Sequence, residues 1–100
     1  MFNKDFVVKI RDYLNNEFGH NPEEGEAIAN YIIDNYQEGS KLILDFSNVS
    51  TINTAFANMI FDAVCKKYNR SILQKYFIMV NYNELIDMTI KKVIENIEEG

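Results

Sequence analysis

Residues 41–68 have the pattern of a strand, a polar loop and a helix in direct succession. Residues 42–46 are apolar apart from Asp45, which is typical of a strand covered on both faces in a parallel sheet. Small polar residues fill the loop 47–54 and interrupt regular structure, because each can bond to its own backbone. Apolar residues then return at helical spacing. This segment predicts a parallel or mixed α/β sheet whose strand-to-helix junction exposes amides and hydroxyls.

Two other segments have the pattern of strands. Residues 6–10 alternate with a period of two, which predicts a strand with one buried face towards an edge of the sheet. Residues 76–80, YFIMV, are apolar without interruption and predict a second strand buried on both faces. Residues 12–19 are compatible with either a hairpin or an irregular loop. The sequence therefore predicts three strands and leaves a fourth open.

Helices are expected between and after these strands. Asn21 suits a helix N-cap and Pro22 the first helical position, and an apolar series from Ile28 to Tyr36 follows at helical spacing. Gly39 suits a left-handed cap that ends this helix. A last helix is expected after Asn81 or Asn83. Its apolar stripe consists of Ile86, Ile90, Val93, Ile94 and Ile97.

The order of these elements indicates the fold class. Strands that alternate with helices of ~12–18 residues imply right-handed crossovers and a sheet that carries helices. The chain has 100 residues, 47% of them apolar, which suits one core. We therefore predict a single α/β domain over residues 1–100, with a small mixed, largely parallel sheet of about four strands and helices packed on it.

Charge and hydropathy exclude several classes of partner. The net charge is −5, and no basic run is longer than two residues, which argues against a nucleic-acid or membrane partner. The longest uninterrupted apolar run, residues 76–80, is far shorter than the ~20 residues of a membrane span. The first residues do not resemble a signal peptide. We expect a cytoplasmic location.

Residue types that carry chemistry are few. Cys65 is the only cysteine and reads as a packing thiol, and His20 reads as a solvated loop residue. Asp45 ends a buried strand, where a carboxylate more often caps the next turn than acts as a base. No glycine-rich phosphate loop, HExxH, CxxC or GxSxG occurs. We expect no enzyme activity, no catalytic residue, no metal site and no cofactor.

The sequence LILDFSNVSTINTAFANMIF, residues 42–61, resembles the strand, loop and helix of STAS domains, the anti-sigma-factor antagonists, in which "LDLSGV" leads to "IDSSGL". It is more similar still to a STAS-like family of unknown function, whose segment reads roughly "LDFSGVxxISSSFADELF". The positions that match are Leu44, Asp45, Phe46, Val49, Ile52, Phe56 and Ala57. Gly25, followed by Ile28, is similar to that family's glycine at the start of the preceding helix. The resemblance implies a STAS-like fold.

In STAS antagonists the second serine of "DSSG" is phosphorylated by a kinase-type anti-sigma factor, and this switches off binding. The four residues fall on Asn53, Thr54, Ala55 and Phe56, so the usual phosphoacceptor position is an alanine. The neighbouring Thr54 is the candidate phosphosite. The simpler interpretation is that Thr54 or Asn53 caps the helix, an interaction worth ~1 kcal/mol.

These features favour a non-enzymatic regulatory module that binds a protein. The resemblance implies a histidine-kinase-like ATPase as the partner, docked on residues 47–58. The expected contact or switch residues are Asn53, Thr54, Ala55, Phe56 and Asn58. The alternative is a sensor of a small anion or nucleotide, held by the amides of residues 53–57.

Two further alternatives remain open at this point. A hydrolase would use Asp45 with a loop hydroxyl, and it has the least support because no histidine lies near in the sequence. A homodimer would instead bury exposed tyrosines such as Tyr68, Tyr76 or Tyr82 against a second copy.

Overall fold

The structure, a computed structural model, describes residues 5–99. Within them, three strands form a parallel sheet in the order β1 (Phe6–Lys9), β3 (Leu42–Asp45), β5 (Phe77–Val80). Two shorter strands, β2 (Phe18–Gly19) and β4 (Thr51–Ile52), form a separate parallel pair. The predicted α/β class is confirmed. The described strands number five in two sheets, and every pairing among them is parallel.

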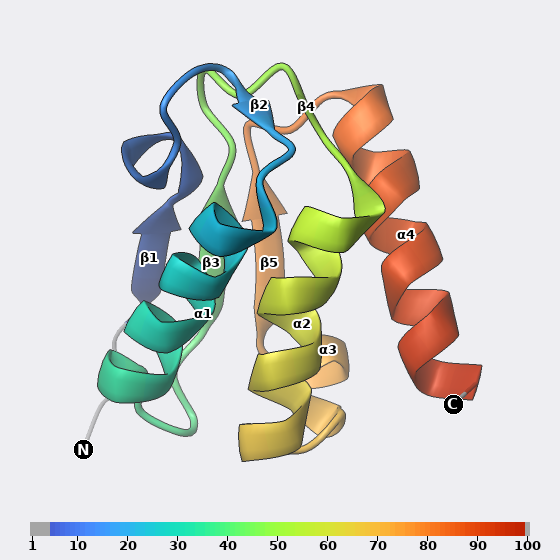
Figure 1. The fold of residues 1–100 in the computed structure, drawn as a ribbon. Helices are drawn as coiled ribbons and strands as arrows, with labels where there is room; N and C mark the ends of the chain where they lie inside the picture. Colours follow the sequence, from blue (N-terminus) through green and yellow to red (C-terminus); the bar gives the residue numbers. More distant parts are fainter. Residues whose placement is uncertain (1–4, 100) are drawn as a thin grey trace.

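Three long helices pack beside the three-stranded sheet, α1 (Pro22–Asn35), α2 (Thr54–Tyr68) and α4 (Glu84–Glu99). Figure 1 shows α1 and α2 in front of the sheet, with α4 on the side of α2 away from α1. The shorter elements are the 3-10 helix η1 (Ile10–Tyr13) and the helix α3 (Ser71–Lys75). No helix within residues 5–99 is long and apolar enough to cross a membrane.

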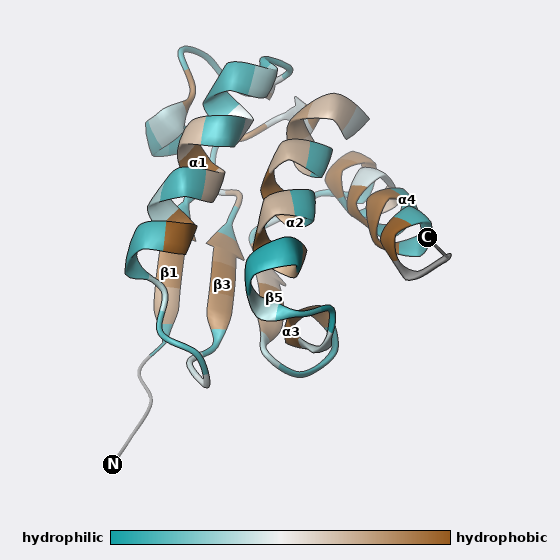
Figure 2. Cartoon of the chain, turned by 60° about the horizontal axis from the view of Figure 1, so that its bottom comes forward, coloured by the Kyte–Doolittle hydropathy of each residue, from teal (hydrophilic) through white to brown (hydrophobic). Residues whose placement is uncertain are grey.

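The connections explain why α1 and α2 share one face. The chain steps from β1 to β3 and then from β3 to β5 in the same direction across the sheet, with one long helix in each crossover. Right-handed crossovers that advance in one direction place their helices on the same face. The core therefore lies between the helices and one side of the sheet, where Val8, Leu42 and Leu44 are almost fully buried. In Figure 2 the strands β1 and β3 are mostly brown, whereas each long helix also carries hydrophilic teal residues.

The prediction that two strands are covered on both faces is wrong. Burial alternates along β3, and β5 is an edge strand on which Ile78 is 37% exposed. Both strands are apolar apart from Asp45 at the end of β3, but the face turned away from α1 and α2 stays open. A run of apolar residues therefore did not distinguish a doubly covered strand from one with an open apolar face.

The ends of two elements differ from the predictions, and the structure decides between the two alternatives left open for residues 12–19. β1 ends at Lys9, because Ile10 begins a 3-10 turn. Residues 12–19 form no hairpin, since the end of this segment becomes β2. α1 ends at Asn35 instead of Gly39. The glycine does have a positive φ of 95°, but it lies in the turn that leads to β3.

Two glycines allow the start of α2 to sit close to its neighbours. A Cβ atom on Gly25 in α1 would lie 2.7 Å from the backbone carbonyl oxygen of Phe56 and 3.2 Å from the Cβ of Met59. A Cβ atom on Gly19 would lie 2.7 Å from Cγ2 of Ile52 and 3.1 Å from the Phe56 ring. Phe56 itself has no exposed surface. The side chain and carbonyl of Phe56 therefore occupy the space that the two glycines leave.

We expect Gly25→Ala to destabilise the protein by ~1–3 kcal/mol, because the new methyl group meets backbone that cannot swing aside. In an exposed helix the same substitution is expected to stabilise by up to ~1 kcal/mol, so the sign of the change is diagnostic. Urea denaturation measures it. Asn30→Ala, on the exposed face of α1, is the control and should lose no stability. Equal stability of Gly25→Ala and the native protein would contradict the close approach.

Candidate functional site

The three long helices begin at the same end of the molecule, beyond the carboxyl ends of the parallel strands (Figure 1). An asparagine side chain caps each of them by accepting a backbone N–H at 2.9 Å. The N–H of Glu23 donates to Asn21, that of Phe56 to Asn53, and that of Ile86 to Asn83. The predicted cap at Asn21 is confirmed, and Asn83 rather than Asn81 begins the last helix. Asn53, not Thr54, caps α2.

Two of these asparagines also use their amide nitrogens. Nδ2 of Asn53 donates to the carbonyl oxygen of His20 at 3.2 Å, and Nδ2 of Asn83 donates to that of Ser50 at 2.7 Å. An asparagine carries both an acceptor and a donor, whereas the carboxylate of an aspartate carries acceptors only. The aspartate of the STAS antagonist motif is thus replaced here by a residue that caps α2 and also ties it to the segment before α1.

The loop between β3 and α2 is held from both sides. Ser50 donates its N–H to the carbonyl oxygen of Glu17 and its hydroxyl to the Glu17 carboxylate, each at 2.8 Å. The Asn53 N–H donates to the carbonyl oxygen of Gly19 at 3.0 Å. On the other side, the Thr89 hydroxyl of α4 lies 3.4 Å from the carbonyl oxygen of Ile52. The loop is therefore held by bonds within the chain on two sides.

The predicted contact residues divide into exposed and structural ones. Thr54, Ala55 and Asn58 are exposed, and together we call them the 54–58 surface. Asn53 is half-buried and serves as the cap. Phe56 is completely buried, so its side chain is not on the surface that a partner would meet. Thr54 is the first residue of α2, with its side chain exposed.

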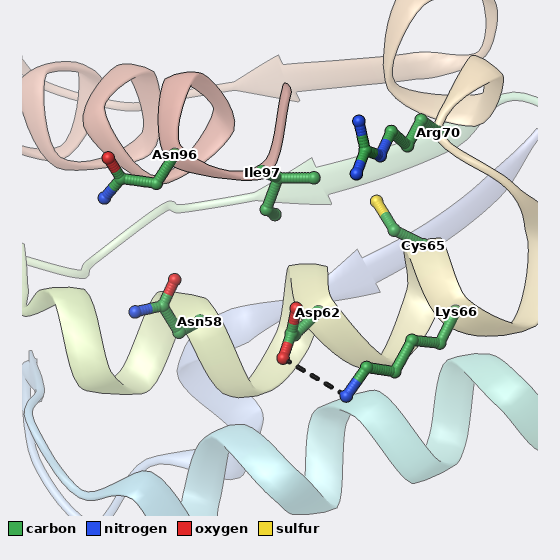
Figure 3. Close-up of a pocket in the computed structure, with 7 residues that line it drawn as sticks. All are labelled: Asn58, Asp62, Cys65, Lys66, Arg70, Asn96 and Ile97. Carbon is green, nitrogen blue, oxygen red and sulfur yellow. Dashed lines mark ion pairs between the residues drawn. The ribbon is translucent and has the colours of Figure 1, made fainter. Parts of the chain in front are cut away.

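A groove of about 510 Å³ extends from this surface between α2 and the end of α4. Figure 3 shows Asn58 and Asp62 on the α2 side and Asn96 and Ile97 on the α4 side. An ion pair of 3.6 Å joins Asp62 to Lys66 at the edge of the groove. Asn58 belongs to both the 54–58 surface and the groove, so the two are continuous.

Sequence reasoning missed the contribution of α4. Tyr82, Leu85 and Met88 are 46%, 60% and 61% exposed, although they are large and apolar. Leu85 and Met88 are three residues apart and lie outside the buried stripe of α4. Apolar residues on the polar side of an amphipathic helix were the signal that could have identified this exposed apolar area on α4.

Asp45 caps a turn. Its Oδ1 accepts from the N–H and the hydroxyl of Ser47, at 3.0 and 2.7 Å, and from Nδ2 of Asn81 at 3.0 Å. The Ser47 hydroxyl, followed by the Asn81 amide, lowers the pKa of this carboxyl. A carboxylate held in its charged form is a weaker base. The hydrolase alternative loses support.

The remaining candidate ligands lie apart. His20 is exposed in the approach to α1. Cys65 is half-buried on α2, and burial raises the pKa of its thiol, which disfavours the reactive thiolate. Across residues 5–99, no three side chains of metal-binding type lie together.

Comparison with known families agrees with the resemblance in residues 42–61. The model of the STAS-like domain of unknown function (DUF4325) matches residues 24–87, and the chain belongs to this family. The match runs from the start of α1 to the start of α4, so it includes Gly25 and the whole of the 54–58 surface. Neither the curated proteins nor the solved structures contain a significant match to the chain.

Asn53→Ala should destabilise the protein by ~1–2 kcal/mol, because it removes the cap of α2 and the bond to His20. Asn53→Asp should cost less, since a carboxylate keeps the cap and suits the helix dipole but cannot donate. Urea denaturation gives both values. Asn58→Ala, exposed and without a capping role, is the matched control and should stay within ~0.5 kcal/mol of the native protein. A loss for Asn53→Ala no larger than for Asn58→Ala would contradict this role.

Asp45→Asn tests the charged cap through its pH dependence. A carboxyl whose pKa is lowered on folding stabilises the native state above the unfolded pKa, and this contribution is lost as the pH falls through the lowered pKa. We expect the variant to be less stable than the native protein at pH 7. The difference should begin to shrink as the pH falls below the ordinary carboxyl value of 3.8 and should disappear below the lowered pKa of the folded state. Denaturation measured from pH 7 to pH 2 follows it. Asp62→Asn is the control; a pH-independent difference at position 45 would rule out the charge as the cause.

Proposed function

We propose that this chain is a non-enzymatic regulatory module that binds a protein partner through the 54–58 surface and the adjoining groove between α2 and α4. One observation carries the proposal. The start of α2 is exposed, fixed in place by hydrogen bonds from both sides, and continuous with an open groove. The resemblance to anti-sigma-factor antagonists suggests a histidine-kinase-like ATPase as the partner.

The fixed loop favours binding because little conformational entropy remains to be lost. Ordering a loop on association can cost several kilocalories per mole, and a preformed surface avoids that cost. Here the β4 segment is paired to β2 and bonded to α4. A partner would therefore meet the 54–58 surface in its final shape.

The composition of the surface indicates the chemistry of the partner. Leu85 and Met88 provide exposed apolar area on α4, and protein interfaces place such area at their centre. Acidic side chains lie on the segments that flank the loop, among them Glu17, Glu23 and Glu84. We expect a partner whose contact area is apolar at its centre and basic at its edge.

Thr54 is the residue on this surface that phosphorylation would change. A phosphate adds about −1.5 to −2 charges, and the start of a helix stabilises an anion, so the helix would tolerate the modified residue. The altered charge would be presented directly to the partner. We propose Thr54 as the switch position, in place of the serine that Ala55 replaces.

A sensor of a small anion is the second candidate. In the part of the chain that the structure describes, the N–H groups of Thr54 and Ala55 donate to no acceptor, so they are available to an anion. The flanking carboxylates of Glu17 and Glu23 oppose it, because they make the local potential negative. This balance leaves the protein partner as the better-supported occupant.

The proposal also covers where the protein is located and which partners it does not bind. A net charge of −5 without a basic cluster is unsuited to nucleic acid or anionic lipid. A kinase-type regulatory partner would place the module in the cytoplasm. We propose a cytoplasmic protein without a cofactor.

Binding to the histidine-kinase-like ATPase encoded nearest to this chain provides the test, measured by titration calorimetry. Ala55→Arg and Asn58→Arg should each weaken binding at least ~10-fold, because each places a bulky cation in the contact area. Thr54→Glu should weaken it in the same direction, as a mimic of the switched state. The melting temperature of each variant should stay close to that of the native protein, since all three positions are exposed.

Asn30→Arg, on the exposed side of α1 and away from this surface, is the control and should bind normally. Unchanged affinity in all three variants would rule out the 54–58 surface. If the native chain does not bind the ATPase but its melting temperature rises with inorganic phosphate or a nucleotide, the anion sensor is the correct function.

A further inference from the structure

The face of the three-stranded sheet turned away from α1 and α2 carries an exposed apolar row. Val7, Ile43 and Ile78 are direct neighbours across β1, β3 and β5. Val7 is 48% exposed and Ile78 37% exposed, with Ile43 half-buried between them. A row of exposed β-branched residues on a sheet is unusual unless a partner covers it.

Charged residues flank this row at both ends in opposite order. Beyond its carboxyl end, Lys9 on β1 lies next to Asp45 on β3. Before its amino end, Asp5 and Lys41 precede the same two strands, and both are exposed. The Phe6 N–H donates to the carbonyl oxygen of Lys41 at 2.7 Å, so the pairing of the two segments continues there. Side chains two residues apart share a face, so all four charges belong to the face of Val7 and Ile43.

We propose that a second copy of this chain covers the open face, related by a two-fold axis that runs across the strands at the level of Ile43. Such an axis places each residue of the apolar row opposite itself. Lys9 then lies opposite Asp5 of the second copy, and Asp45 lies opposite Lys41 of the second copy. A two-fold interface requires a surface that complements itself, and this arrangement of charges does so.

Another orientation of the axis does not satisfy the charges. An axis that is parallel to the strands and passes over the central strand β3 would place Asp45 opposite Asp45 of the second copy, and Lys9 opposite the apolar Val80. Like charges that face each other across an interface are destabilising. An axis between β1 and β3 would pair opposite charges, but it would leave β5 without a facing strand. Of the two axes that cover all three strands, only the one across the strands pairs opposite charges, and it makes the strands of the two facing sheets antiparallel.

The three tyrosines considered for a homodimer do not provide an equivalent surface, because only Tyr82, just before α4, is exposed, at 46%. The Tyr68 hydroxyl donates to the carbonyl oxygens of Ile33 and Tyr36 within the chain, at 3.1 and 3.3 Å. Tyr76 is half-buried and lines a small cavity that Tyr68 also lines. The open sheet face is thus the better interface between copies.

The dimer is expected to be weak. A face of three short strands is smaller than the ~800 Å² per partner of a standard stable interface. The charges at its rim set the orientation more than they add affinity. This inference does not depend on the proposed docking function, because the 54–58 surface lies on α2, which covers the opposite face of the sheet.

Sedimentation velocity on the full chain, from ~10 µM to ~1 mM, detects an association of this strength. The native protein should shift from monomer towards dimer over this range. Lys9→Glu should weaken the dimer at least ~10-fold, because it faces Asp5 of the second copy with a like charge. The double variant Asp5→Lys with Lys9→Glu should restore it, since both partners of the pair are then reversed.

Val7→Lys should also abolish association, whereas Leu85→Lys, which removes an exposed apolar residue from α4, should leave it unchanged. Circular dichroism serves to check that each variant folds. A native protein that stays monomeric throughout overturns the proposal, and so does a dimer that Val7→Lys leaves intact. If Lys9→Glu weakens the dimer and the double variant does not restore it, the axis across the strands is wrong.

Discussion

The close approach of α1 and α2 at Gly25 and Phe56 fixes the position of the start of α2, on which the candidate site depends. No side chain larger than hydrogen fits at Gly25, because the Phe56 carbonyl oxygen fills the space. The Phe56 ring in turn lies against Gly19, and Gly19 also lies against the side chain of Ile52. The start of α2, the end of β2 and the end of β4 therefore form one packed unit. This explains why Phe56 is buried although Thr54, Ala55 and Asn58 in the same segment are exposed.

Hydrogen bonds add direction to this packing. The side-chain oxygens of Asn53 and Asn83 each accept an N–H from the start of a helix, and their side-chain nitrogens each donate to the carbonyl oxygen of a neighbouring segment. Asparagine also supplies the positive φ values at Asn48 and Asn81, where the chain turns after β3 and β5. Asparagines therefore do three things at the carboxyl end of the sheet. They cap helices, bond to neighbouring segments and adopt the positive φ values of tight turns. A phosphoserine switch of the antagonist kind has no place at Ala55.

The sequence predicted those features that depend on local pattern. The helix starting at Pro22, the strands around Leu42 and Phe77 and the stripe of α4 follow from periodicity and capping residues, and the structure confirms them. The sequence did not predict the contacts between distant segments. The pairing of Phe18 with Thr51 joins two-residue strands too short to show any periodicity. The open sheet face was missed because an apolar run does not reveal which of its faces is covered.

The candidate site shows the same division. Residues 53–58 were found through their resemblance to a family motif, but the motif did not separate Phe56, which supports the loop, from Ala55, which is exposed. That separation depends on the direction of each side chain around α2, which is set by the contact with α1. The motif also omits α4, although Thr89 and Asn83 hold the loop from that side. The candidate site depends on α2 and on the segments that pack around its start. A single sequence segment predicts such a site only in part, because its residues indicate neither which distant segments contact it nor which of its side chains point towards them.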